Sequence, residues 1–108
     1  VNYLTQLGHK RIAQISGPES ATLCQFRHQG YQQALRRAGI TMNPTYTTYG
    51  DFTFESGVKA VRQLLSLPDA PTAIFCHNDT MAIGAMQEAK RLGLRIPRDL
   101  SVVGFDDI

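Results

Sequence analysis

Four apolar runs cross this chain, and each breaks off at a short polar cluster, which is the pattern that most constrains its fold. Between the runs lie segments in which apolar residues recur at helical spacing, so strands and helices alternate along the chain. That alternation predicts an α/β fold, an open parallel sheet with right-handed crossovers and helices on both faces. The expected strands are residues 11–16, 45–49, 72–76 and 101–105.

The expected helices have recognisable ends. A short helix is expected over residues 1–8, and three longer helices connect the strands. Side chains that can cap a helix start and glycines that can end one are found at the expected places. The candidate caps and stops are Gly8, Ser20, Gly39, Asp51 or Thr53, Asn78 or Asp79, and Gly93. The last strand lacks alternation of apolar and polar residues, which predicts a strand buried on both faces.

Side chains suited to a ring with several hydroxyl groups lie near the ends of the expected strands. Open α/β sheets bind ligands at the carboxyl ends of their strands. A guanidinium can bind ligand oxygens bidentately, an aromatic ring can stack on a flat ring, and an amide can both donate and accept. Two acids after a buried strand are costly unless they meet a ligand, a metal or a helix N-terminus. The candidate ligand-binding residues are Arg27, Phe52, Asn78 and Asp106.

Each candidate also has an ordinary structural explanation. Arg27 can be a surface arginine whose stem covers apolar neighbours, and Phe52 can be a core residue. Asn78 can be a plain helix cap. The sequence leaves these alternatives open. A carboxylate such as Asp106 accepts hydrogen bonds from vicinal hydroxyls, so a sugar or a ribose is the expected partner of this set.

Composition excludes several classes of protein. The 11 Lys and Arg residues against 9 Asp and Glu give a net charge of +2, which is too small for a nucleic-acid-binding surface. Cys24 and Cys76 lie far apart and form no CxxC motif, so neither a disulfide framework nor a zinc site is expected. No apolar stretch approaches the ~20 residues needed to cross a bilayer. We expect a cytoplasmic protein without a membrane segment, a metal or a cofactor.

Catalytic motifs are missing from the sequence. It contains no G-x-S-x-G elbow, no G-x-G-x-x-G turn and no P-loop, and its three histidines are scattered. An acid–base pair of His77 and Asp79 is conceivable, but the two lie at a single helix start. A phosphoryl-accepting receiver domain has the same gross fold but needs its paired acids after the first strand, whereas Asp106 and Asp107 come last. We therefore expect a protein that is not an enzyme.

Six groups of residues carry a resemblance to a known family: Leu7 to Ile12; Arg27 with Gly30-Tyr31; Gly50-Asp51-Phe52; Pro71 to Cys76; Asn78-Asp79 with Met81 to Gly84; and Ile96-Pro97 with Ser101 to Asp107. Together they resemble the effector-binding region of the lac repressor family, specifically the second lobe of its periplasmic-binding-protein-like core. In such repressors the residues that match Arg27, Phe52, Asn78 and Asp106 line the effector cleft. The resemblance thus implies the same site as the residue chemistry.

Within that family the closest likeness is to a repressor that responds to cytidine. It rests on Leu23-Cys24, residues 34–37, residues 50–55 and Cys76-His77. The resemblance implies a nucleoside effector, with Asp106 and Arg27 near the ribose and Phe52 against the base. Ala21 and Leu23 stand where purine-binding relatives have polar side chains, which argues against a free oxopurine.

The resemblance also implies how this chain fits into a larger protein. Residues 1–108 would be part of an effector-binding domain, its C-terminal lobe, while the helix-turn-helix and the first lobe lie outside this chain. DNA would be bound through that absent domain, and the protein would be a homodimer. The candidate dimer-interface residues are Ile83, Met86 and Gln87, for which packing against the sheet is the alternative. The rival function is a sugar-binding protein of a transporter, which shares the fold.

Overall fold

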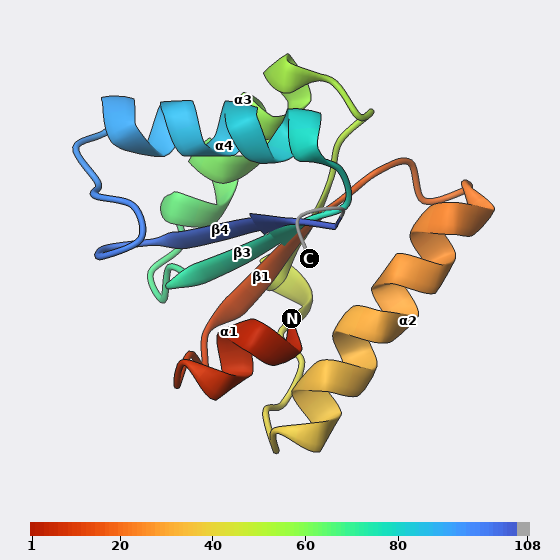
Figure 1. Ribbon diagram of the computed structural model, residues 1–108. Coiled ribbons are helices and arrows are strands. Elements are labelled where there is room, and N and C mark those ends of the chain that lie inside the picture. The colour runs from red at the N-terminus through yellow and green to blue at the C-terminus, as the bar shows by residue number, and fades with distance from the viewer. Residues whose placement is uncertain (106–108) are drawn as a thin grey trace.

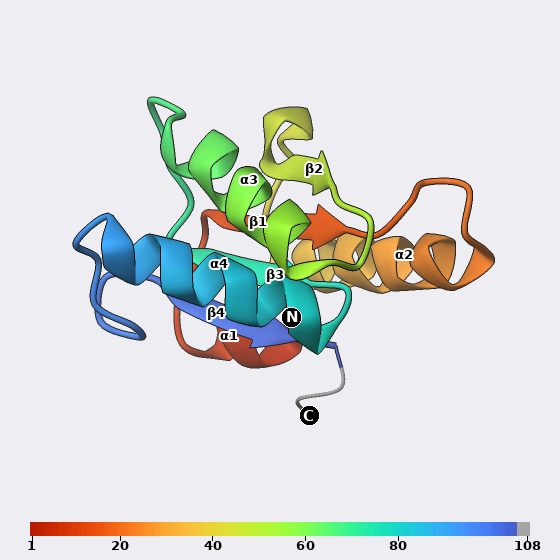
Figure 2. The ribbon, with the colours of Figure 1, turned by 90° about the horizontal axis from the view of Figure 1, so that it is seen from above.

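A four-stranded parallel sheet forms the centre of the computed structural model, which describes residues 1–105 (Figure 1). Its strands are β1 (Ile12–Ser16), β2 (Thr47–Tyr49), β3 (Ala73–Cys76) and β4 (Ser101–Gly104). They lie in the order β2-β1-β3-β4, with Ile12 opposite Ala73 and Ala73 opposite Ser101. All four strands run in the same direction, so their carboxyl ends lie at one edge of the sheet (Figure 2).

Helices cover both faces of the sheet, which confirms the predicted architecture (Figures 1 and 2). On one face lie α1 (Asn2–Gln6) and α2 (Thr22–Arg37), and on the other lie α3 (Phe54–Leu65) and α4 (Asp79–Arg91). A 3-10 turn, η1 (Pro44–Tyr46), precedes β2, so this strand is shorter than expected. None of the helices within residues 1–105 is long and apolar enough to cross a bilayer.

The larger core lies between the sheet and the α3–α4 pair. Alternate strand residues such as Ile15 and Ile74 point to this face and pack with Leu64 of α3 and Met81 of α4. The two helices approach each other closely at Gly57, where an added Cβ would collide with the backbone of Met81. The same holds at Gly84 on α4, where an added Cβ would collide with the backbone of Phe54 on α3. These two glycines set the spacing of the helix pair.

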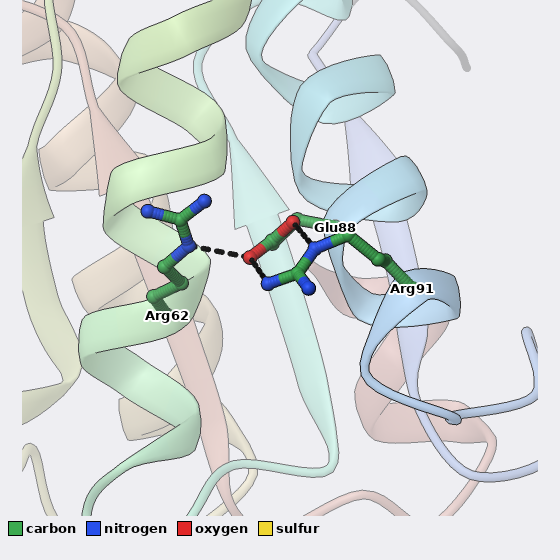
Figure 3. Close-up of polar contacts among 3 residues, drawn as sticks. All are labelled: Arg62, Glu88 and Arg91. Carbon is green, nitrogen blue, oxygen red and sulfur yellow. Dashed lines mark hydrogen bonds and ion pairs between the residues drawn. The ribbon is translucent and has the colours of Figure 1, made fainter.

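One buried carboxylate ties α3 to α4. Glu88 is only 4% exposed, and it accepts hydrogen bonds from Arg62 on α3 and from Arg91 on its own helix (Figure 3). The Arg91 contacts measure 2.7 Å from Nε and 2.8 Å from Nη2. Hydrogen bonds from Arg91 and Arg62 lower the pKa of Glu88 from 4.5 to about 2. The charge of Glu88 is thus compensated on both sides, as a buried charge requires.

The smaller core lies between the sheet and α2. Tyr31 and Leu35 are buried against Ile12 and Phe75, and the Tyr31 hydroxyl donates to the Ile12 carbonyl at 2.6 Å. The amino-terminal half of α2 extends past this core, as Figure 1 shows. Apolar side chains there are exposed, Leu23 by 53% and Phe26 by 66%. Leu23, Phe26, Tyr31 and Leu35 all recur at helical spacing. Only Tyr31 and Leu35 of these four pack into this core.

Several predicted boundaries are right and others need correction. Gly8, Gly39 and Gly93 follow their helices with φ values of +92°, +73° and +94°, the left-handed conformation that glycine adopts most easily. Ser20 does not cap α2, because the cap residue is Ala21 and no side-chain bond is made there. The prediction that the last strand is buried on both faces is confirmed in part, because Val102 packs against one core and Val103 against the other. Val102 and Val103 are only half-buried because β4 lies at the sheet edge.

Candidate ligand-binding site

Loops after three of the strands meet at the carboxyl edge of the sheet, and two of them carry the predicted site residues Phe52 and Asn78. Gly17 follows β1, Phe52 follows β2, and Asn78 follows β3. A backbone hydrogen bond of 2.6 Å from Gly50 to Ser16 joins the first two loops. Asp106, the fourth predicted residue, lies outside the described residues, directly after Phe105 in the sequence.

Arg27 reaches this edge from α2. Its Nη1 donates to the carbonyl of His77, the residue that follows β3. The guanidinium carbon lies 4.0 Å from the centre of the Phe105 ring, a distance typical of a cation–π contact. Its Nε is buried and has no hydrogen-bond partner among residues 1–105. A buried donor without a partner is costly, so the contacts with His77 and Phe105 must hold this guanidinium in place.

Phe52 lies in a conformation that is unusual for a large side chain. Its φ is +72°, the left-handed region that residues other than glycine rarely occupy. The ring is half-buried and lies so close to Gly17 that a Cβ there would collide with it and with the sulfur of Cys24. Backbone strain of this kind persists only where surrounding contacts hold it, and it is concentrated at functional sites. Gly17 therefore provides the space in which the ring lies.

Asn78 links α4 to the Phe52 loop. Its Oδ1 accepts from the backbone N–H of Met81 at 2.9 Å, so Asn78 is the cap of α4 rather than Asp79. Its Nδ2 donates to the Phe52 carbonyl at 3.1 Å. Because an amide nitrogen carries two hydrogens, one donor of Asn78 remains for a ligand. A contact of Asn78 with a ligand stays a prediction.

Asp79 is an acidic group at this edge that the sequence suggests as a cap or as the partner of His77. Its side chain is exposed and lies over Gly104, where an added Cβ would collide with its Oδ1. His77, by contrast, is fully buried. Of the acid–base pair that the sequence allows, His77 therefore lies in the interior and Asp79 lies at the surface.

A buried polar cluster beneath the site was not predicted. Gln14 on β1 is completely buried, and its Oε1 accepts from His77 Nε2 at 2.9 Å. Its Nε2 donates to Thr47 Oγ1 at 3.1 Å and contacts Nδ1 of His28 on α2. Burial, followed by the charges of Arg27 and His28, lowers the pKa of His77 from 6.5 to about 4. The one signal in the sequence was a glutamine inside the apolar run of residues 12–15.

An apolar groove of about 710 Å³ opens beside Arg27 on the α2 face. Leu23 and Phe26 of α2 line one side, and Phe105 lies at the end of β4. Arg27 has the only charged side chain among the described residues that line the groove. Such a combination of apolar walls and a few polar groups is typical of small-molecule sites.

Within residues 1–105 no group of three or more His, Cys, Asp or Glu side chains could hold a metal ion. Cys24 and Cys76 are both free and buried. Burial raises the pKa of the Cys76 thiol, which disfavours the reactive thiolate. These two residues therefore serve as small apolar side chains in the cores.

The predicted dimer-interface residues lie on α4. Ile83 is 46% exposed, Gln87 is exposed and Met86 is half-buried. Packing against the sheet therefore does not bury these three side chains completely. Ile83 is one of the large apolar side chains that reach solvent on this half of the molecule. A role in dimerisation stays a prediction.

Comparisons with known proteins agree with the fold and with the sequence motifs. The family model described as periplasmic binding protein-like domain matches residues 1–108. The HTH-type transcriptional repressor CytR of Escherichia coli (strain K12) is 61% identical over 108 residues, which are 100% of this chain and 32% of that repressor. The chain thus spans about a third of the length of the curated relatives it matches.

Two solved structures superpose closely on this chain. A regulatory protein of the LacI family from Chloroflexus aggregans has a TM-score of 0.93 and 44% identity, covering 98% of this chain and 38% of that one. The transcriptional regulator CelR, solved as a cellobiose complex, has a TM-score of 0.93 and 42% identity, covering 98% and 32%. The chain therefore belongs to the family of periplasmic binding protein-like domains, in the form that LacI-family transcriptional regulators contain.

Proposed function

We propose that this chain is the C-terminal lobe of the effector-binding domain of a transcriptional repressor, and that the effector is a nucleoside such as cytidine. The observation that carries the proposal is the meeting of Arg27, Phe52 and Asn78 at one edge of the sheet. A cation, an aromatic ring and an amide at one edge match the groups of a nucleoside, which has a flat base and a polyhydroxylated sugar. The likeness to a cytidine-responsive repressor supports the same ligand.

The proposed contacts follow from the free groups at the edge. The Phe52 ring stacks on the base, and the remaining Asn78 amide hydrogen donates to a polar atom of the ligand. The guanidinium of Arg27 binds a ligand oxygen. Asp106 follows Phe105, whose ring contacts Arg27, and its carboxylate accepts from the ribose hydroxyls.

In the whole protein the ligand would bridge two lobes and change their relative angle. Because a ligand shifts an equilibrium only by its different affinity for the two states, its total contacts with the two lobes would have to differ between the open and closed forms. The angle would set the spacing of two DNA-binding domains in a cytoplasmic homodimer, joined partly through Ile83, Met86 and Gln87 of α4. DNA would be bound through a domain outside this chain.

A sugar ligand is the alternative. The same guanidinium, amide and carboxylate suit vicinal hydroxyls, and CelR, one of the two solved structures, is a complex with cellobiose. A sugar-binding protein of a transporter would also have this fold. An apolar groove beside Arg27 and an aromatic ring at the edge are expected for both ligand classes, so the ligand must be tested directly.

The test is thermal unfolding of the full-length protein with cytidine, adenosine, ribose or hypoxanthine. A ligand that binds only the folded state raises the melting temperature. We expect cytidine to raise it most and hypoxanthine to leave it unchanged. A rise with ribose equal to that with cytidine would favour the sugar alternative.

A further inference from the structure

Hydrogen bonds beneath the site connect three strands and one helix through a single buried side chain. Gln14 lies in β1, with β3 on one side and β2 on the other. Its amide contacts His77 after β3, Thr47 on β2 and His28 on α2. A fully buried glutamine with this many partners fixes the relative positions of the elements it joins.

His77 has a double role in this arrangement. Its side chain donates to Gln14 Oε1, and its backbone carbonyl accepts from Arg27 Nη1. Its ring is fully buried, 5.4 Å from the ring of Phe75. The residue that Gln14 holds is therefore the same residue that holds Arg27.

Consecutive residues of α2 are tied to this pair. Arg27 contacts the His77 carbonyl, and His28 contacts the Gln14 amide. The Phe105 ring supplies a further restraint from the end of β4, 4.0 Å from the guanidinium carbon. The Arg27 guanidinium is thus held by His77 after β3, which Gln14 of β1 holds in turn, and by Phe105 after β4.

We propose that Gln14 and His77 are positioning residues that hold Arg27 in its ligand-binding orientation. The inference rests on the proposed function in that Arg27 is taken to contact the effector. Holding a long side chain before the ligand arrives removes part of the entropy cost of binding, because fewer rotamers have to be lost.

A purely structural role for the same residues makes a different prediction. If Gln14 only stabilised the sheet, its removal would weaken ligand binding to the same degree whether or not Arg27 were present. If it acts through Arg27, its removal has no further effect once Arg27 is gone. A double-mutant cycle separates the two cases.

The experiment uses the full-length protein with Gln14→Met, Arg27→Met and the double variant. Methionine keeps the length of Gln14 and most of the aliphatic stem of Arg27, and it removes the hydrogen bonds of both side chains. Calorimetry with cytidine should show that Gln14→Met raises Kd by roughly five- to tenfold, and by less than about twofold in the Arg27→Met background. The matched control is Ile74→Val, a core change on the opposite face of β3, which should leave Kd unchanged.

A second readout needs no ligand. The Nε–H resonance of Arg27, assigned by its loss in Arg27→Met, should shift and broaden in Gln14→Met because the guanidinium becomes mobile. An unchanged resonance, or equal losses of affinity in both backgrounds, would overturn the positioning role. If wild-type protein fails to bind cytidine, the proposed effector is wrong, and the resonance alone decides whether Gln14 positions Arg27.

Discussion

The side-chain amide of Asn78 donates to the backbone carbonyl of Phe52 at 3.1 Å, so the cap of α4 also holds the loop that follows β2. The same side chain accepts from the backbone of Met81. One residue thus fixes both the start of a helix and the left-handed conformation of an aromatic residue at the candidate site. Local structure and site geometry are coupled at this point.

Asn78→Ala is expected to lower the free energy of unfolding by about 1–2 kcal/mol, because it removes the helix cap and the bond to Phe52. Asn78→Asp keeps an oxygen for Met81 but loses the donor to Phe52, so it should preserve most of the stability and weaken ligand binding. Asp79→Ala, at the neighbouring position that does not cap, is the control. Urea unfolding measures all three, and equal losses for Asn78→Ala and Asp79→Ala would contradict the assignment.

Two glycine substitutions should have opposite effects. Gly17→Ala places a methyl group against the Phe52 ring and the Cys24 sulfur, so overpacking should cost about 1–3 kcal/mol. Gly30 lies within α2 with open space around its Cα, and Gly30→Ala should stabilise the fold by roughly 0.5–1 kcal/mol. Thermal or urea unfolding of both variants checks the prediction. A stabilising Gly17→Ala would mean that the Phe52 ring does not lie where we describe it.

The ion pairs of Glu88 should make stability depend on pH in acid. Hydrogen bonds from Arg91 and Arg62 lower the pKa of Glu88 from 4.5 to about 2. A carboxylate with a lowered pKa stabilises the fold above its unfolded pKa, and the contribution is lost as pH falls from about 4.5 to about 2. The stability difference between wild type and Glu88→Gln should therefore shrink across this range. A difference that stays constant from pH 6 to pH 2.5 would contradict the prediction.

His77 should make stability depend on pH in a higher range than Glu88 does. Burial, aided by the charges of Arg27 and His28, lowers its pKa from 6.5 to about 4. Between these two pH values His77 is protonated in the unfolded chain and neutral in the folded chain. Stability is complete above about pH 6.5 and declines as pH falls toward 4, by at most roughly 3 kcal/mol. An NMR titration of the His77 ring measures the pKa directly. A midpoint near 6.5 would contradict the burial of the ring that we describe.

The alternation of strands and helices could be predicted because its signals are local. Apolar periodicity, caps such as Thr53 and the glycine stops each act within a few residues, and the structure confirms them. The burial of particular side chains could not be predicted in the same way. Phe26 has the helical spacing of a core residue yet is 66% exposed, because α2 extends beyond the sheet.

The grouping of the candidate site residues could be predicted in part for a similar reason. The topology of a parallel sheet brings residues after different strands to one edge, so Phe52 and Asn78 could be grouped from sequence, and the long side chain of Arg27 could be expected to reach back to them from its helix. The cluster of Gln14, Thr47, His28 and His77 depends on which side chains meet across three strands and a helix. Such contacts between residues far apart in the sequence leave no local pattern, apart from one polar residue inside an apolar run.

The most direct test of the account is calorimetric titration of cytidine and ribose into the full-length protein and its Asp106→Ala variant. We predict that wild type binds cytidine more tightly than ribose. Loss of a charged hydrogen-bond partner costs about 1.5–3 kcal/mol, so Asp106→Ala should weaken cytidine binding roughly ten- to a hundredfold. Unchanged cytidine affinity in Asp106→Ala, or ribose binding as tight as that of cytidine, would contradict a nucleoside site at this edge of the sheet.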